Sequence, residues 1–373
     1  DDTPGKSIED KIFLDIMEKD FHKNEHGNWC APLPFKPNRE RLPNNFPMAL
    51  RRAKTLDRSL QSNKEKREHF LEFMHNLIQN NHAEIAPKLD EGAESWYLPV
   101  FGIYHPKKPG KIRCVFDSSA KFGDVSLNNV LLQGPDLNNS LLSVLMRFRK
   151  NRIAASADVQ QMFYSFSVDE KHRDFLRFLW HEDNDLDKQL VAFRMTVHVF
   201  GNSPSPAVAT YGLRKCSNLA EPDVRDFIQR HFYVDDGLIS LDSSQDMIDL
   251  LTRTQKTLLE EGNIRLHKFA SNSDEVMSAL PHEDLAQDLK SIDFDSDSVP
   301  LQRSLGLYWD LATDCFTYRI SEESKPFTRR GVLSTLNSLF DPLGFVAPVI
   351  IKGKIILREL MAQSVDWDEP LPE

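Results

Sequence analysis

The first 95 residues carry apolar side chains mainly at helical spacing. This spacing predicts helices over residues 7–21 and 63–81. The proline-rich stretch 31–47 between them predicts a loop, because proline lacks the backbone donor that regular structure uses. We therefore expect residues 1–95 to be a mostly helical N-terminal region that serves as a connector or extension.

From residue 96 onward, short β-type runs interleave with helical segments. Pairs of runs predict three hairpins, the first with a basic Pro-Lys-Lys-Pro-Gly tip: 96–104 with 112–116, 175–180 with 190–195, and 305–309 with 315–320. A buried strand is predicted at 154–159, and helices are predicted at 137–150, from 162–166 onward, at 204–219, and at 328–360 with interruptions at its prolines. The acidic stretch 281–300 is expected to be a loop or insertion. The mixture indicates an α/β protein.

Size and charge narrow the class of protein. A chain of 373 residues is expected to form two or three lobes, and no apolar run approaches membrane-spanning length, which excludes a membrane protein. A net charge of −10 opposes a general nucleic-acid coat, because such binding depends on Lys and Arg neutralising phosphates. Nucleic acid would need a local basic surface, and basic clusters at 39–67, 107–113 and 147–152 are either such surfaces or solvated faces.

The cysteines and the first residues bear on context. The four cysteines are scattered without a Cys-x-x-Cys pair, which argues against zinc and against a disulfide framework and favours a reducing compartment. The chain starts without Met or a signal peptide, so we expect it to be a piece of a longer polypeptide.

The most specific feature is the run Phe-Tyr-Val-Asp-Asp-Gly-Leu-Ile at 232–239. Two apolar segments meet at an Asp-Gly step, which predicts a hairpin with Asp235 and Asp236 at its tip. The Asp-Gly step alone is explained by turn geometry, but that explanation requires nothing of Asp235. Adjacent carboxylates repel each other unless a cation compensates them, so a metal site is indicated.

A third carboxylate, Asp158, lies at the end of the predicted strand 153–159. Asp158 lies where a strand exit would direct its side chain toward a neighbouring hairpin tip. Magnesium prefers oxygen ligands and is usually held by one or two carboxylates together with substrate phosphates. The alternative is that Asp158 is a helix N-cap.

These residues resemble motifs A and C of reverse transcriptases. Asp-Val-Gln-Gln-Met-Phe at 158–163 precedes Tyr-Val-Asp-Asp at 233–236, and the wording of 104–119 and 131–137 resembles the BEL/Pao class of long-terminal-repeat retrotransposons. The resemblance covers nearly the whole chain. It implies a right-hand polymerase fold with an antiparallel palm sheet, with fingers and palm at 96–325 and the thumb and start of the connection at 326–373.

The resemblance implies an RNA- and DNA-directed DNA polymerase that extends a primer by two-metal catalysis. Asp158, Asp235 and Asp236, with the carbonyl of Val159, would hold two Mg²⁺ ions, for which Mn²⁺ could substitute. Lys107 or Lys108 and Arg113 would contact the incoming triphosphate. Phe163 would exclude a 2′-hydroxyl, and Lys268 would be the motif D lysine, although a core aromatic and an exposed lysine are the alternatives.

Other residues match the template and primer contacts of the family. These are Gly201, Ser203 and Pro204 in motif B, Tyr233 in motif C, and Leu305 and Gly306 in the primer-grip hairpin. Motif B departs from the retroviral Leu-Pro-Gln-Gly form, since Val199-Phe200-Gly201 stands in its place, which weakens the transfer of individual contacts.

The implied partners are a primed RNA or DNA template, deoxynucleoside triphosphates, and protease, RNase H and integrase domains of a parent Pol polyprotein. The expected location is intracellular, in a cytoplasmic virus-like particle, with no membrane partner. Two other functions remain open: a co-opted fragment that only binds nucleic acid or a partner, and a metal-dependent nuclease. The nuclease ranks last because no His or Lys lies beside the Asp-Asp tip in the sequence.

Overall fold

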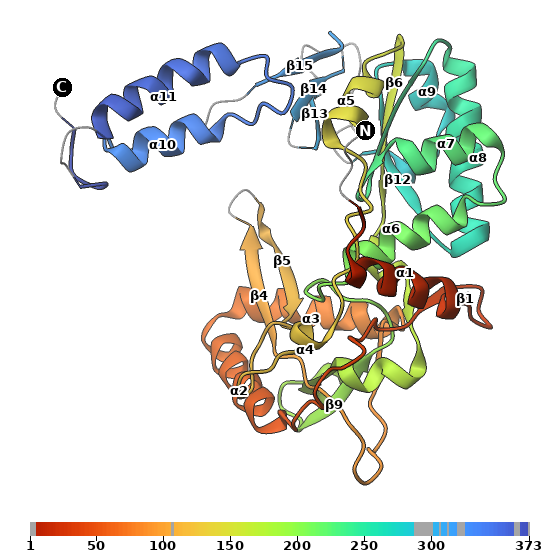
Figure 1. Ribbon diagram of the computed structural model, residues 1–373, viewed down its shortest axis with the longest axis vertical. Coiled ribbons are helices and arrows are strands. Elements are labelled where there is room, and N and C mark those ends of the chain that lie inside the picture. Colours follow the sequence, from red (N-terminus) through yellow and green to blue (C-terminus); the bar gives the residue numbers. More distant parts are fainter. Residues whose placement is uncertain are drawn as a thin grey trace. The chain divides into compact units, whose positions relative to one another are not determined.

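The computed structural model describes residues 5–105, 108–286, 301–305, 307–311, 313–318, 325–361 and 366–371. The chain forms two compact units, shown together in Figure 1, and passes between them several times. Unit 1 comprises Asp1–Asn138, Gln160–Ala220 and Thr257–Arg265, and unit 2 comprises Asn139–Val159, Glu221–Lys256 and Leu266–Glu373. The division expected at residues 95 and 325 follows the parts of a polymerase rather than compactness and stays a prediction.

Unit 1 combines helices with short sheets, whose strand pairs are antiparallel except for the parallel pair β2–β7. Its helices are α1 (Ile8–Asp20), α2 (Phe46–Ser62), α3 (Lys64–Gln79), α4 (Leu127–Val130) and α6 (Ser205–Cys216), with 3₁₀ turns η1 (Met162–Ser165), η2 (Glu170–Leu176) and η3 (Glu182–Asn184). Its strands are β1 (His22–Lys23), β2 (Trp29–Ala31), β3 (Ala83–Ile85), β4 (Val100–His105), β5 (Lys108–Phe116), β7 (Ser167–Val168), β8 (Arg177–His181) and β9 (Leu190–Met195).

The helical patterns near the N-terminus form as predicted. Ser7 caps α1 through a reciprocal capping box with Asp10, which satisfies backbone donors that a helix start leaves open. Helix α3 contributes Phe70 and Met74 to a large core, where Phe70 stacks on Trp180 at a centroid distance of 5.4 Å. This core joins α2 and α3 to the hairpin β8–β9, which the short β-type runs at 175–180 and 190–195 also predicted.

Unit 2 contains a four-stranded antiparallel sheet in the order β10-β11-β6-β12. Its helices are α5 (Leu141–Phe148), α7 (Pro222–Arg230), most of α8 (Ser244–Gly262), α9 (Asp274–Ala279), α10 (Arg329–Ser338) and α11 (Ala347–Met361), with a 3₁₀ turn η4 (His282–Asp284). Its strands are β6 (Ile153–Val159), β10 (Phe232–Tyr233), β11 (Asp236–Leu241), β12 (Leu266–Ser271), β13 (Leu301–Ser304), β14 (Leu307–Asp310) and β15 (Cys315–Thr317).

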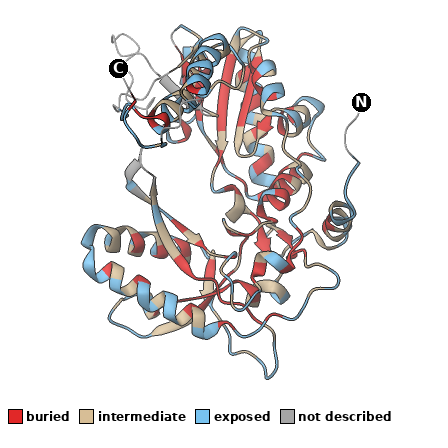
Figure 2. Ribbon diagram, turned by 60° about the vertical axis from the view of Figure 1, so that its left-hand side comes forward, coloured by how far each residue is buried: buried red, intermediate tan, exposed pale blue. Residues whose placement is uncertain are grey.

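Strand β6 lies in the interior of this sheet and is almost entirely buried. Ala154, Ala155, Ala157 and Val159 are each at most 2% exposed, and Figure 2 shows the buried strands of this sheet in red. Buried strands with neighbours on both sides are rigid supports for a site, because their side-chain positions are fixed by register and packing. Asp158 is the polar residue near the end of this strand.

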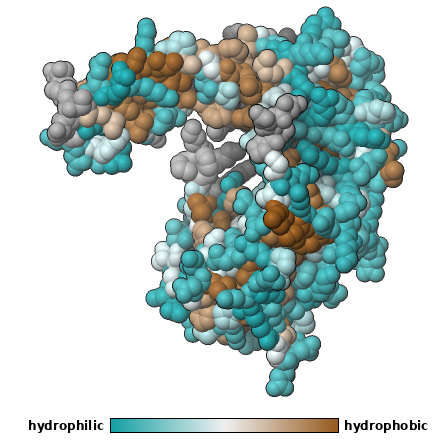
Figure 3. Space-filling view, in the orientation of Figure 1, coloured by the Kyte–Doolittle hydropathy of each residue, from teal (hydrophilic) through white to brown (hydrophobic). Residues whose placement is uncertain are grey.

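The end of unit 2 is a small sheet, β13-β14-β15, followed by two helices. The helices α10 and α11 pack on each other, and hydrophobic surface is visible over them in Figure 3. Ile351, Ile355 and Ile356 of α11 are all more than 40% exposed. Among the described helices, none combines the length and the apolar character that crossing a bilayer would require.

Several predicted boundaries are wrong for local reasons. The helix expected from 162–166 is only the turn η1, because Gln161 before it has a left-handed φ of +48° and Phe166 after it is extended. The helix expected at 137–150 begins at Leu141, where Ser140 caps it. In the segment 328–360 the interruption expected at Pro342 is present between α10 and α11, whereas the one expected at Pro348 is wrong, because Pro348 lies in the first turn of α11. Of the acidic stretch 281–300, only 281–286 lies in the described part, and it contains η4.

Candidate active site

The sheet of unit 2 brings carboxylates from distant parts of the sequence together. In the register of β11 and β6, Asp236 pairs directly with Asp158. Directly opposed side chains on antiparallel strands have Cβ atoms about 5 Å apart, and like charges in such a pair are destabilising. Asp235 lies in the turn before β11, and its carbonyl oxygen accepts a hydrogen bond of 2.9 Å from the backbone N–H of Val159. The predicted proximity of Asp158 to the Asp-Asp hairpin is therefore present in the fold.

The turn of this hairpin is not at the Asp-Gly step. Tyr233 pairs with Asp236 and Phe232 with Gly237, so the two loop residues are Val234 and Asp235. Gly237 is needed for a different reason, since a Cβ there would lie 2.6 Å from Cζ of Phe232. Val234 has φ +58°, a region that β-branched residues rarely adopt. The sharp turn at Val234 thus stores local backbone strain beside the acidic residues.

The Asp236 side chain lies in an environment that opposes its charge. Burial raises the pKa of its carboxyl, and the negative charges of Asp235 and Asp158 raise it further, to about 7, against a smaller opposite effect of Lys268. A nearby cation would lower the cost of ionising this group.

The other neighbour of Asp158 is strand β12, which supplies cationic groups. Nε2 of His267 lies 3.0 Å from Oδ1 of Asp158, and Nζ of Lys268 lies 3.0 Å from Oδ2. Burial by itself would raise the pKa of the Asp158 carboxyl, but hydrogen bonds from His267 and Lys268 hold it below its ordinary value. A nuclease was ranked last because no His or Lys lies beside the Asp-Asp tip in the sequence. In the fold this argument is wrong, because β12 brings His267 and Lys268 to Asp158.

The residues at this edge fit a divalent metal in their chemistry but not in their present arrangement. Three carboxylates meet the preference of magnesium for oxygen ligands, and the raised pKa of Asp236 marks an excess of negative charge. Within the described residues, however, no group of three or more His, Cys, Asp or Glu side chains is arranged to hold a metal ion. Both oxygens of Asp158 instead contact side chains of β12.

The residues predicted to contact the nucleotide belong mainly to unit 1. The guanidinium of Arg113 lies over the ring of Phe200 at 5.4 Å, and the rings of Phe200 and Phe163 are 6.0 Å apart. Phe163 is only half-buried, so it is not an ordinary core aromatic. Lys107 lies outside the described residues, and Lys108 begins β5, where its backbone alone is described.

The Gly201 loop, residues 199–204, is held by side chains from an earlier part of unit 1. Nδ2 of Asn128 donates to the carbonyl of Gly201 at 2.9 Å, and Oδ1 of Asn128 accepts from the N–H of Ser203 at 2.9 Å. The Ser118 hydroxyl donates to Oδ1 of Asn202. Gly201 has φ +122°, and a Cβ there would overlap the carbonyl oxygen of Phe116. Only glycine satisfies both demands.

The remaining predicted contacts are placed as follows. Pro204 immediately precedes α6, Tyr233 ends β10, and Leu305 has φ +50° in the turn between β13 and β14. Gly306 lies outside the described residues. The predicted final hairpin gains an additional strand, β13, which the sequence pattern did not indicate.

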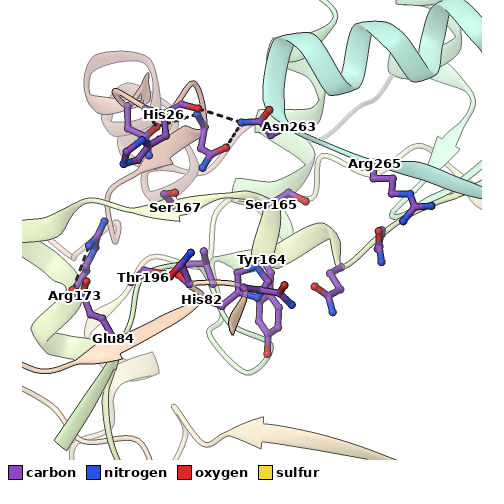
Figure 4. Close-up of a pocket in the computed structure, with 17 residues that line it drawn as sticks. His26, His82, Glu84, Tyr164, Ser165, Ser167, Arg173, Thr196, Asn263 and Arg265 are labelled. Atoms are coloured by element: carbon purple, nitrogen blue, oxygen red, sulfur yellow. Dashed lines mark hydrogen bonds and ion pairs between the residues drawn. The ribbon is translucent and has the colours of Figure 1, made fainter. Parts of the chain in front are cut away.

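Unit 1 also contains a polar cavity of about 710 Å³ that no sequence pattern indicated. It is lined by amide, hydroxyl and charged side chains, several of which are labelled in Figure 4. Arg173 and Glu84 form an ion pair of 3.3 Å at its wall, and Nδ2 of Asn263 donates to the carbonyl of His26 at 3.3 Å. The rings of His82 and Tyr164 lie 4.9 Å apart.

Sequence reasoning missed three residues that contact the predicted ones: His267, Asn128 and Phe200. His267 is adjacent to the predicted Lys268, and Phe200 is adjacent to the predicted Gly201, so closer attention to neighbours could have found them. Asn128 carries no signal, because its partners Gly201 and Ser203 are more than seventy residues away.

Solved structures with a similar fold include those of a viral protease-reverse transcriptase. The fold is similar to a foamy viral protease-reverse transcriptase solved with double-stranded DNA, with a TM-score of 0.52, 16% identity, and coverage of 78% of this chain and 42% of that chain. A second structure of the foamy viral protease-reverse transcriptase, with an RNA/DNA hybrid, gives a TM-score of 0.50 and 14% identity over 88% of this chain and 35% of that chain. This chain has a reverse-transcriptase-like fold.

A family model described as a Pao retrotransposon-like RNaseH-like domain matches residues 328–373. No curated protein sequence matches the chain. Together the matches support a Pol region of a retroelement, and the chain spans less than half the length of the solved viral proteins. The mixed α/β class is confirmed, whereas fingers, palm and thumb stay predicted assignments.

Proposed function

We propose that the chain is the DNA-polymerising part of a retroelement reverse transcriptase, which adds deoxynucleotides to a primer on an RNA or DNA template. The observation that supports this most is the register of β6 and β11, which opposes Asp158 and Asp236 next to Asp235. A polymerase needs clustered carboxylates of this kind on a rigid element. The similarity of the fold to viral reverse transcriptases supports the same function.

In this proposal the side chains of the protein bind the metal, offset the charge of the triphosphate and exclude ribonucleotides. Asp158, Asp235 and Asp236, with the carbonyl of Val159, would hold magnesium, which supplies activation of the primer 3′-hydroxyl and stabilisation of the leaving pyrophosphate. Arg113 would offset the charge of the triphosphate, and Phe163 would exclude the 2′-hydroxyl of a ribonucleotide. The neighbouring rings of Phe163 and Phe200, with the Arg113 guanidinium over Phe200, support this role, because they place an aromatic side chain and a cation side by side.

The Gly201 loop and the turn at Leu305 would contact template and primer in this proposal. Asn128 hydrogen-bonds to two backbone groups of the Gly201 loop, the carbonyl of Gly201 and the N–H of Ser203. The shape of the loop is therefore fixed before any ligand binds. A fixed loop loses little conformational freedom on binding, which favours affinity for a nucleic-acid backbone. The proposed setting is the Pol polyprotein of a virus-like particle in the cytoplasm, with protease, RNase H and integrase domains as partners.

Primer extension tests the proposal. The purified chain is incubated with poly(rA)·oligo(dT) or a primed DNA template, deoxynucleotides and Mg²⁺ or Mn²⁺, beside an Asp235→Asn Asp236→Asn double variant. We expect extension by the parent and a loss of at least about 1,000-fold in the variant, because removing charge stabilisation of the transition state costs several kcal/mol. The exposed Asp187 provides a matched control, since Asp187→Asn removes a carboxylate from a loop of unit 1. Binding of labelled primer-template without extension by any protein would instead favour a fragment that only binds.

Hydrolysis of RNA is the second candidate, because the matched family model describes an RNaseH-like domain. Two acidic residues in the described part of that match have structural partners. Asp341 accepts from the N–H groups of Phe345 and Val346, and Asp368 pairs with Arg330 at 2.7 Å. A 5′-labelled RNA strand in the same hybrid separates the two functions. We expect the labelled RNA to keep its full length after primer extension by the parent. If the parent shortens the RNA and the Asp235→Asn Asp236→Asn variant does not, the carboxylates serve a nuclease instead.

A further inference from the structure

Lys268 and His267 are consecutive residues, yet both reach the same carboxylate. In a regular strand, successive side chains point to opposite faces of the sheet. The pairing of β12 with β6 shifts between His267 and Ala270, and Lys268 has φ +53°, so the strand has a bulge at this point. A bulge re-aims a side chain at the cost of local strain. The strand is thus bent where it delivers a second cation to Asp158.

The two cationic partners of Asp158 differ in how firmly they are held. His267 is 17% exposed and forms the cross-strand pair with Asp158, so the register of the sheet fixes it. The Lys268 side chain is 51% exposed, and its ammonium is carried on a flexible stem. Exposed ion pairs contribute only about 0–1 kcal/mol, so the Lys268 ammonium can leave Asp158 at little cost. His267 therefore holds the carboxylate in place, whereas Lys268 is exchangeable.

A divalent cation at Asp158 would compete with this ammonium. Positive charges a few ångströms apart repel each other strongly outside bulk water. Oδ2 of Asp158 contacts Nζ of Lys268 at 3.0 Å, which places the ammonium where a metal bound by Asp158 and Asp236 would approach.

We propose that Lys268 is the resident counterion of Asp158 in the metal-free protein, and that binding of a divalent cation displaces it while His267 keeps the carboxylate positioned. This inference rests on the proposed function, because it assumes that the carboxylates of β6 and β11 bind metal. Lys268 then sets the metal affinity of the free protein. It offsets part of the charge of the acidic edge until the metal binds.

Metal binding to the full chain, without nucleic acid or nucleotide, tests this role by a readout other than activity. The free Mn²⁺ signal in electron paramagnetic resonance is titrated against the parent, Lys268→Met, Lys268→Arg and the Asp235→Asn Asp236→Asn variant. Lys354 lies exposed on α11, and Lys354→Met serves as the matched control for loss of one positive charge.

We expect Lys268→Met to bind Mn²⁺ about 3- to 5-fold more tightly than the parent, because a competing charge worth up to about 1 kcal/mol is removed. Lys268→Arg and Lys354→Met should remain within about twofold of the parent, and the advantage of Lys268→Met should shrink as salt screens the ion pair. His267→Ala should weaken Mn²⁺ binding, because the carboxylate loses the group that orients it.

The outcomes separate this inference from the proposed function. If the parent binds Mn²⁺, the Asp235→Asn Asp236→Asn variant does not, and Lys268→Met binds no more tightly than the parent, the counterion role is wrong and the metal site stands. If neither the parent nor Lys268→Met binds Mn²⁺, the metal site and the counterion role both fail. Equal tightening by Lys268→Met and Lys354→Met would show a general charge effect and would also overturn the role of Lys268.

Discussion

The acidic edge of unit 2 and the Gly201 loop of unit 1 are built on opposite physical principles. The acidic edge, Asp158, Asp235 and Asp236 with His267 and Lys268, gathers like charges that repel, and cations from β12 offset only part of the repulsion. The Gly201 loop is neutral, and Asn128 satisfies its backbone groups. Stability and the proposed function therefore oppose each other at the edge and agree at the loop. Substitutions should raise stability but reduce activity at the edge, and reduce both at the loop.

The largest effect is expected at the loop, from Gly201→Ala. A Cβ would overlap the carbonyl oxygen of Phe116, and the φ of +122° is unfavourable for alanine. We expect the free energy of unfolding to fall by about 3 kcal/mol or more, together with primer extension, because both strain and steric overlap are introduced. Urea unfolding measures it. Gly5→Ala is the control, since nothing lies within 4 Å of its Cβ position, and an equal loss there would contradict the explanation.

At the acidic edge, Asp236→Asn should stabilise the metal-free protein while reducing primer extension. The folded pKa of about 7 lies above the ordinary value of 3.8, so the folded state binds more protons than the unfolded chain between these pH values. The stability of the parent consequently falls as pH rises through this window. We expect the variant to be more stable at pH 8 by on the order of 3 kcal/mol, and to match the parent near pH 4.

Thermal and urea unfolding in a metal chelator, from pH 4 to pH 8, measure this difference. Asp187→Asn, in an exposed loop of unit 1, should leave the pH dependence of the parent unchanged. A variant no more stable than the parent at pH 8 would show that like charges do not destabilise this edge.

A smaller loss is expected from Asn128→Ala at the loop. The change removes the hydrogen bonds to the carbonyl of Gly201 and the N–H of Ser203. We expect a decrease of about 2 kcal/mol in the free energy of unfolding, because partly buried polar groups lose their partners. Hydrogen exchange at the Ser203 amide provides the local readout. Asn218 is exposed after α6, and Asn218→Ala should change neither quantity.

The smallest effect is expected from Val234→Asn, which relieves strain at the acidic edge. Asparagine tolerates φ near +58° better than valine, so the variant should be more stable by about 1 kcal/mol. Urea unfolding of the metal-free protein measures the change. A loss of stability would mean that packing of the valine side chain outweighs the backbone strain.

The sequence by itself determined the elements with strong local signals and the carboxylates. Helical periodicity located α1 and α3, and short β-type runs located the hairpin β8–β9. Asp235 and Asp236 were recognised because adjacent carboxylates are costly without a cation. Asp158 was recognised from its place at the end of a buried strand.

Only the tertiary structure decided what surrounds these groups. His267 reaches Asp158 across 109 residues of sequence, and Asn128 reaches Gly201 across 73, so no local pattern could reveal either contact. The hairpin turn lies at Val234 and Asp235 rather than at the Asp-Gly step predicted from the sequence. Gly237 instead lies inside the strand, where the ring of Phe232 leaves no room for a Cβ. Strand pairing and packing depend on all neighbours at once, and a one-residue change of register moves every side chain to the other face. For this reason the sequence indicated the metal-binding chemistry of the carboxylates, whereas only the fold determined which cations offset their charge.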